Sequence, residues 1–137
     1  WGAAMATKGQ LEERLRTELS RLYKETTGRG ASRVTVDIVR DMILLRYEDA
    51  LLPLERTYLR LPDGEHRVQA LRQWLLDANR QAMIEIIEHV TGVGVLALWG
   101  HLHIQTGTRF GLVLLEEDLE AKLKAEPNAD RLLSWRR

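Results

Sequence analysis

The sequence predicts an α+β fold: two α-β-β units form a four-stranded, mainly antiparallel sheet with two long helices on one face and a C-terminal helical extension. Three observations lead to this prediction. Two long segments carry apolar residues at helical spacing, each ends in a Thr-Gly-x-Gly sequence at 27–30 or 91–94, and two strand-like apolar stretches follow each time. The repeat is loose, because the two units share few identical residues.

The first helix is predicted over residues 8–26. Thr7 and Gln10 have capping-box spacing at its start, and Gly28 can adopt the left-handed conformation that ends a helix without steric penalty. Apolar residues at steps of three and four mark its buried face, namely Leu11, Leu15, Leu19 and Leu22.

An antiparallel hairpin is predicted next, from strands at 34–39 and 42–47. The connecting Arg40-Asp41 pair lacks the glycine or asparagine that two-residue hairpin turns favour, so the strands are better supported than the turn. Pro53 then suits the first turn of a short helix through about Tyr58, because a backbone N–H would have no intrahelical partner there.

The second long helix is predicted over residues 65–90, with Asp63 as its cap. At 1.5 Å per residue it would be about 39 Å long, so it must lie across the sheet or protrude toward a partner. Its buried stripe is predicted to comprise Val68, Leu71, Leu75, Ala78, Ala82 and Ile86, widened by Met83, Ile87 and Val90. Trp74 and Leu76 fall outside the narrow stripe, so part of the opposite face could also be covered.

A second hairpin is predicted from strands at 93–104 and 109–115, joined through residues 105–108, where Gly107 supplies the turn conformation. The chain is then expected to be helical around Leu119 and Leu123 and to break at Pro127.

A single domain is predicted over residues 5–124. Residues 1–4 resemble an expression scar before Met5, and residues 125–137 are expected to form an amphipathic extension. The chain contains no cysteine, which excludes disulfides, thiolate catalysis and Cys-ligated metal centres and makes a cytoplasmic location the expectation.

Charge gives no indication of a nucleic-acid partner, since twenty basic residues balance twenty acidic ones. No apolar run approaches the roughly 20 residues that a transmembrane helix needs. The sequence therefore predicts a protein without a transmembrane segment.

The two Thr-Gly-x-Gly sequences could bind phosphate if a helix began after them. Both follow a predicted helix and precede a strand, and neither has the Lys-Ser/Thr pair of a nucleoside-triphosphate loop. Helix termination is therefore the preferred interpretation, and no cofactor is predicted.

His101 and His103 are weak candidate metal ligands, because they alternate along one strand and their rings would lie about 7 Å apart. No local spacing supplies the third protein ligand that zinc needs. If Thr106-Gly107 is a two-residue turn, the same face carries Trp99, Phe110 and Leu112, which suits histidines at the edge of a core or an interface.

Catalytic residues are not predicted. Asp37, Asp41, Glu48 and Asp49 are carboxylates around the first hairpin, but nothing in the sequence fixes their distances, and turn or solvent-facing roles are the simpler interpretation. Ser20, Ser32 and Ser134 lie in no nucleophile-elbow pattern.

Interaction surfaces are the remaining candidates. The apolar and basic C-terminal segment is expected to pack onto the parent domain or a twin subunit, with docking on a partner or a membrane surface as the alternative. Apolar surface on the second long helix adds to the expectation of a homodimer or another protein partner. The candidate interaction residues are Trp74, Trp99, His101, His103, Leu132 and Trp135.

Several short stretches in this order and spacing resemble the MpsC family, a widespread bacterial domain of largely uncharacterised function, over residues 8 to about 120. The stretches are Lys8-Gly9-Gln10, Leu22-Tyr23-Lys24-Glu25, Thr27-Gly28-Arg29-Gly30, Val39-Arg40-Asp41-Met42, Leu52-Pro53-Leu54-Glu55, Ile87-Glu88, Thr91-Gly92 and Gln105-Thr106-Gly107 with Arg109. The sequence departs from the family pattern at 99–103, where Trp, Gly, His, Leu and His replace the expected small polar or acidic residues.

The resemblance implies a non-enzymatic accessory or regulatory protein of a membrane system that handles cations or bicarbonate, with no catalytic residues to carry over. Two alternatives stay open. One is a sensor domain that binds a small anion or a metal ion, and the other is an enzyme with a dispersed site.

Overall fold

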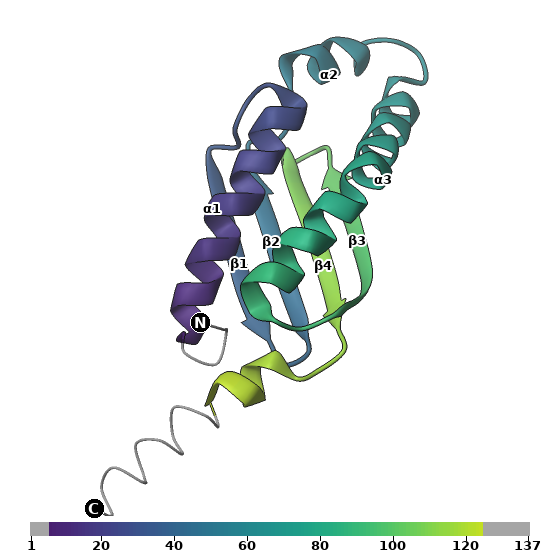
Figure 1. Cartoon of the computed structure of the whole chain (residues 1–137). Helices are drawn as coiled ribbons and strands as arrows, with labels where there is room; N and C mark the ends of the chain where they lie inside the picture. The colour runs from purple at the N-terminus through teal and green to yellow at the C-terminus, as the bar shows by residue number, and fades with distance from the viewer. Residues whose placement is uncertain (1–5, 125–137) are drawn as a thin grey trace, which may run out of the picture.

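The computed structural model describes residues 6–124 of the chain (Figure 1). The elements are α1 (Lys8–Thr27), β1 (Arg33–Val39), β2 (Met42–Glu48), α2 (Pro53–Tyr58), α3 (Gly64–Thr91), β3 (Val95–His103) and β4 (Thr108–Leu115). A further helical segment runs over residues 119–124.

The strands form one antiparallel sheet in the order β1-β2-β4-β3, so the two hairpins lie side by side and β2 pairs with β4 at the centre. Figure 1 shows α1 and α3 lying across the same face of this sheet. The apolar core fills the space between them, with Leu15, Ile43 and Ile87 fully buried. The predicted α+β fold is therefore confirmed.

The two Thr-Gly turns have equivalent structural roles. Gly28 and Gly92 are both left-handed C-caps, with φ of 81° and 70°. The hydroxyl of Thr27 donates to the carbonyls of Tyr23 and Arg29, and that of Thr91 donates to the carbonyl of Ile87 at 2.7 Å. Each threonine thus secures the last turn of its helix before the chain enters a hairpin, which confirms the helix-termination interpretation.

The two helix starts differ from each other. Thr7 and Gln10 form the predicted reciprocal capping box of α1. Asp63 occupies the N-cap position of α3, but its backbone is left-handed, with φ of 65°, and its side chain makes no capping hydrogen bond. The prediction that Asp63 caps α3 is therefore correct for the position and wrong for the side chain.

The predicted buried stripe of α3 is correct at Val68, but at its next two members, Leu71 and Leu75, it lies one residue before the true stripe. Leu71 is 42% exposed, whereas Leu76, which was placed outside the stripe, is 5% exposed. The buried residues are Gly64, Val68, Arg72, Leu76, Met83, Ile87, Val90 and Thr91. The error arises because the true stripe contains an arginine, which an apolar pattern excludes.

The second hairpin has a four-residue loop, since His103 pairs with Thr108. Gly107 in this loop has φ of 67°, the turn conformation expected of it. A two-residue turn at Thr106-Gly107 would have shifted the pairing by two residues, and a shift by an even number leaves every side chain on the same face.

Side chains from the helices engage both edges of the sheet. Glu12 of α1 accepts from the N–H of Ile38 in β1 at 2.8 Å. On the other edge, Gln69 donates to the carbonyl of Leu102 at 2.7 Å and Arg80 to that of Leu98 at 2.8 Å. These contacts occupy backbone groups that would otherwise accept another strand.

Gly64 allows α3 to begin against the end of α2. A Cβ atom at this position would overlap the carbonyl oxygen of Tyr58 and lie 2.8 Å from the carbonyl carbon. We expect Gly64→Ala to lower the free energy of unfolding by about 1–3 kcal/mol, because backbone atoms must move to relieve the overlap. Urea denaturation measures the change.

Gly9→Ala in α1 is the matched control, since nothing lies within 4 Å of a Cβ atom there. Alanine is the better helix former, so this variant should be as stable as the wild type or more stable by up to about 1 kcal/mol. Equal stability of the two variants would show that the α2–α3 junction has room for a side chain.

Candidate functional site

A buried ion pair joins α3 to α2. The guanidinium of Arg72 lies against the carboxylate of Glu55, with both Nε to Oε2 and Nη2 to Oε1 at 2.6 Å. The side chains are 5% and 1% exposed. Such a two-point geometry is the strongest form of arginine–carboxylate contact, and the low dielectric around it makes each partner depend on the other.

Two further contacts bring four of the five N–H groups of the Arg72 guanidinium into hydrogen bonds. Its Nη1 donates to the hydroxyl of Tyr23 in α1 at 3.0 Å, and its Nη2 donates to the carbonyl of Ala50 at 2.5 Å. Burial alone would lower the pKa of Arg72, but the hydrogen bonds to Glu55 and Tyr23 outweigh it and raise the pKa above its ordinary value. Arg72 is therefore a cation that ties α1, α2 and α3 together.

Arg109 of β4 is a second buried arginine, 8% exposed, with a different environment. Its guanidinium carbon lies 5.4 Å from the centre of the Tyr47 ring, over the face of the ring. Within residues 6–124 its side chain has no hydrogen bond and no ion pair. Burial, together with the like charge of Arg72, lowers the pKa of Arg109.

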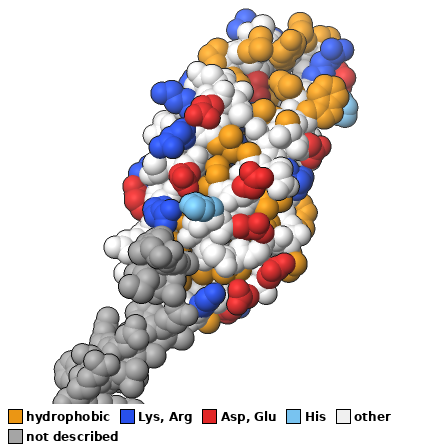
Figure 2. All heavy atoms as spheres, viewed as in Figure 1, with side chains coloured by type: hydrophobic (Ala, Val, Ile, Leu, Met, Phe, Trp, Pro, Cys, Tyr) orange, Lys and Arg blue, Asp and Glu red, His pale blue; other side chains and the backbone are white. Residues whose placement is uncertain are grey.

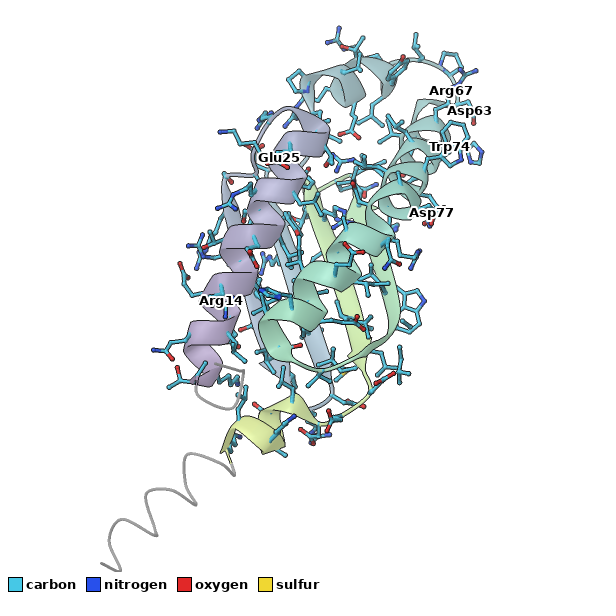
Figure 3. All side chains as sticks on the ribbon, in the orientation of Figure 1. Arg14, Glu25, Asp63, Arg67, Trp74 and Asp77 are labelled. Carbon is cyan, nitrogen blue, oxygen red and sulfur yellow. The ribbon has the colours of Figure 1, made fainter. Side chains whose placement is uncertain are left out.

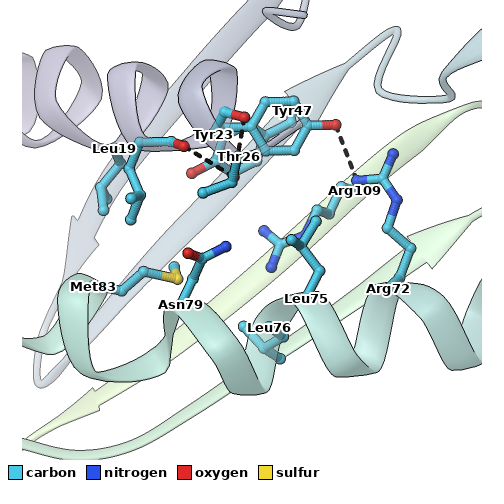
Figure 4. Close-up of a pocket in the computed structure, with 11 residues that line it drawn as sticks. Leu19, Tyr23, Thr26, Tyr47, Arg72, Leu75, Leu76, Asn79, Met83 and Arg109 are labelled. Carbon is cyan, nitrogen blue, oxygen red and sulfur yellow. Dashed lines mark hydrogen bonds between the residues drawn. The ribbon is translucent and has the colours of Figure 1, made fainter. Parts of the chain in front are cut away.

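The two arginines and two tyrosines share one space under α3 (Figure 4). The rings of Tyr23 and Tyr47 lie 4.9 Å apart, and burial raises the pKa of Tyr47 to about 12. An adjoining pocket of about 200 Å³ opens between α3 and β3, and Arg72 and Arg109 line it as well. This adjoining pocket, here called the arginine pocket, has two arginines and no acidic residue in its lining.

Sequence reasoning missed this constellation, although three of its members lie in the stretches that carry the family resemblance. Tyr23, Glu55 and Arg109 come from elements far apart in the chain, and the fold brings them together. The available signal was Arg72, a charged residue at the exact helical spacing of Val68 and Leu76.

The second candidate site is the face of the sheet turned away from the helices, here called the outer face. Two rows of paired residues cross its middle: Asp37, Leu44, Leu112 and Trp99, then Thr35, Arg46, Phe110 and His101. Leu44, Trp99 and Phe110 are 41%, 53% and 45% exposed. A shallow hollow of about 430 Å³ lies among these side chains.

Three predicted interaction residues lie on or beside this face. Trp99 pairs with Leu112 and His101 with Phe110, so the expected sharing of a face is confirmed. His103 lies at the end of β3, where its Nδ1 is 2.8 Å from the hydroxyl of Thr106. Among residues 6–124 no group of three or more His, Asp or Glu side chains is placed to hold a metal ion.

Trp74 lies elsewhere, on the side of α3 that points away from the sheet (Figure 3). It is 71% exposed, so the described chain does not cover that side of the helix as the sequence had suggested. Figure 2 shows apolar side chains gathered at the same end of the molecule, over α2 and the start of α3. Leu132 and Trp135 lie outside the described residues.

The candidate carboxylates of the first hairpin do not form one cluster. Asp49 pairs with Arg29 at 2.6 Å and with Arg56 at 3.6 Å, while Glu48 pairs with Arg46 at 3.3 Å. Asp37 projects from the outer face of β1. The turn and surface roles expected of these residues agree with these positions.

None of the helices within residues 6–124 is both long enough and apolar enough to cross a membrane.

The chain is 29% identical over 118 residues to the uncharacterized protein YbcI of Bacillus subtilis strain 168. The aligned region covers 86% of this chain and 95% of that protein. No solved structure matches the chain significantly. The model of one family, described as the Na⁺-translocating membrane potential-generating system MpsC, matches residues 7–117. The chain therefore belongs to the MpsC family.

Proposed function

We propose that this chain is a non-enzymatic accessory protein of a membrane-potential-generating system, and that it works as a homodimer whose two copies meet through the outer face of the sheet. The observation that carries the proposal is the exposed apolar centre of that face, with Leu44, Trp99 and Phe110 each more than 40% exposed. The association with a membrane system rests on the description of the family, which names a Na⁺-translocating membrane potential-generating system.

The outer face has the organisation of a protein interface. The middle rows contain an apolar group with polar residues beside it, and the pairs Arg33–Glu48 and His103–Thr108 make one end polar. The apolar group is Leu44, Leu112, Trp99 and Phe110, and the polar residues beside it are Asp37, Thr35, Arg46 and His101. An apolar centre with a polar rim is the usual anatomy of a contact between subunits. Helix side chains already engage both edge strands, so the face is the better place for a second copy than the edges are.

The size of the face also suits a dimer. Strands of at least seven residues, four abreast, give a footprint of roughly 19 by 23 Å at the usual strand spacing and rise. The planar area of this footprint is roughly 440 Å², about half of the 800 Å² per partner that an interface of standard size buries, and the relief of the side chains adds to it.

The charges on the face favour a second copy of this chain over a strongly charged partner. With a two-fold axis parallel to the strands, β2 of one copy would face β4 of the other, and β1 would face β3. Arg46 would then meet the ring of Phe110 of the second copy, Asp37 would face Trp99 of that copy, and Thr35 would face its His101. Such an arrangement places a cation on an aromatic face, and in the two middle rows it brings no like charges opposite each other.

The accessory role is tested in cells that lack the gene for this chain. We expect deletion to reduce the Na⁺-dependent membrane potential, measured with a voltage-sensitive dye, and wild-type protein to restore it. Trp99→Glu should fail to restore it, because the added charges would separate the two outer faces.

Ala78→Glu is the control, since it adds the same charge to an exposed position of α3 on the helix side of the molecule. It should restore the potential as the wild type does. An unchanged potential after deletion, or full restoration by Trp99→Glu at equal protein levels, would contradict the proposal.

A further inference from the structure

The buried charges of the core do not balance. The carboxylate of Glu55 neutralises Arg72 through two hydrogen bonds. Arg109 is buried to a similar degree, and within residues 6–124 no carboxylate contacts it. An arginine stays protonated even when buried, and an unpaired buried cation is strongly unfavourable. The contact with the Tyr47 ring offsets only part of this cost.

The arginine pocket offers space for the missing anion. Of its lining residues none is acidic, and the uncharged ones include Gln69, Gln73 and Gly100. The carbonyls of Leu98 and Leu102 face the edge of the sheet, so by strand alternation the N–H of Gly100 between them faces the same edge. The pocket therefore combines a cation with neutral hydrogen-bond donors.

We propose that Arg109 and the arginine pocket bind a small planar oxyanion of the carboxylate type, a class that includes carboxylates and bicarbonate. A guanidinium presents its N–H groups as a planar fork that matches two oxygens held in one plane. The pocket volume of about 200 Å³ lies below the range of about 300–1,000 Å³ that is typical for drug-sized ligands. The ligand is therefore a small ion of a few heavy atoms.

Gly100 is part of this site. A Cβ atom there would lie 2.9 Å from Nη2 of Arg109 and 3.3 Å from Leu76, so only glycine leaves the guanidinium in its present position. Gly100→Ala should displace the head of Arg109 while keeping its charge. This variant therefore tests whether binding requires the guanidinium in its present position or only a positive charge in the pocket.

The arginine pocket opens between α3 and β3, and its lining shares Gly100 and His101 with the hollow of the outer face, although the anion proposal does not rest on the dimer. The experiment titrates the full chain with sodium bicarbonate and, separately, sodium acetate. Ionic strength is held constant with the sodium salt of a bulky sulfonate buffer. Two readouts are followed, namely the backbone amide NMR signals around Gly100 and Arg109 and the midpoint of thermal unfolding.

In the wild type we expect saturable NMR shifts and a raised unfolding midpoint with bicarbonate, with acetate or with both. Comparison of the two titrations shows whether the pocket binds bicarbonate, carboxylates or both. Arg109→Met should weaken binding at least tenfold and should unfold at a higher temperature than the anion-free wild type, because it removes an unpaired buried charge. Gly100→Ala should also weaken binding. Arg67→Met, which removes an exposed charge from α3, should bind as the wild type does.

A wild type that shows no saturable response to either anion would overturn the proposal. So would Arg109→Met that binds as tightly as the wild type. If Arg109→Met fails to fold, Gly100→Ala decides, and undiminished binding by Gly100→Ala would place the anion elsewhere.

Discussion

Replacing Arg72 by methionine should lower the free energy of unfolding by about 3–5 kcal/mol. The reason is the carboxylate of Glu55, which is 1% exposed and would lose both hydrogen bonds from the guanidinium. The hydroxyl of Tyr23 and the carbonyl of Ala50 would lose their donor as well. Urea denaturation followed by circular dichroism measures the change.

Two further variants make the interpretation specific. The double variant Arg72→Met/Glu55→Leu should recover most of the loss, because apolar residues can replace a buried ion pair at little cost when both partners are removed. Arg80→Met on the same helix removes a pair with Asp77, which is 55% exposed, and a hydrogen bond to the carbonyl of Leu98, and should cost no more than about 1–2 kcal/mol. A loss at Arg72 no larger than the loss at Arg80 would mean that the buried network does not organise the fold.

Replacing Trp99 by glutamate should weaken the proposed dimer by more than about 100-fold in dissociation constant. Because the interface is two-fold symmetric, one substitution introduces two charges into an apolar centre and removes two aromatic side chains. Trp99 is 53% exposed in the single chain, so the folding of that chain should change little. Sedimentation equilibrium gives both dissociation constants.

Trp74→Glu is the matched control, since it changes the same residue type on the outward side of α3, at a position that is 71% exposed. It should leave the dimer intact. A dimer weakened by Trp74→Glu and untouched by Trp99→Glu would place the interface on the helices.

The fold could be predicted because its signals are local. The capping box at Thr7, the glycines at 28 and 92 and the alternation in the strands each depend on neighbouring residues. The outer face could also be predicted, because Trp99 and His101 are two residues apart on one strand and therefore lie on the same face. The residues of the neighbouring strand stay on that face as well when the register changes by an even number.

The arginine pocket could not be predicted, because it depends on contacts between distant elements. Glu55 and Arg72 are 17 positions apart, and Tyr23 and Arg72 are 49 apart. A search for apolar periodicity in α3 discards the charged residue around which the network forms. The useful signal would have been Arg72, which completes the apolar stripe of α3, considered together with Glu55, an acidic residue in the first turn of a predicted short helix.

Cross-linking in the cysteine-free chain tests the outer-face dimer most directly, because any introduced thiol is the only one present. Leu112→Cys places it in the middle of the face and Trp74→Cys places it on α3. A short flexible bismaleimide should convert Leu112→Cys to a covalent dimer in dilute solution and leave Trp74→Cys monomeric. A monomeric Leu112→Cys, or a covalent dimer formed only by Trp74→Cys, would contradict the outer-face homodimer.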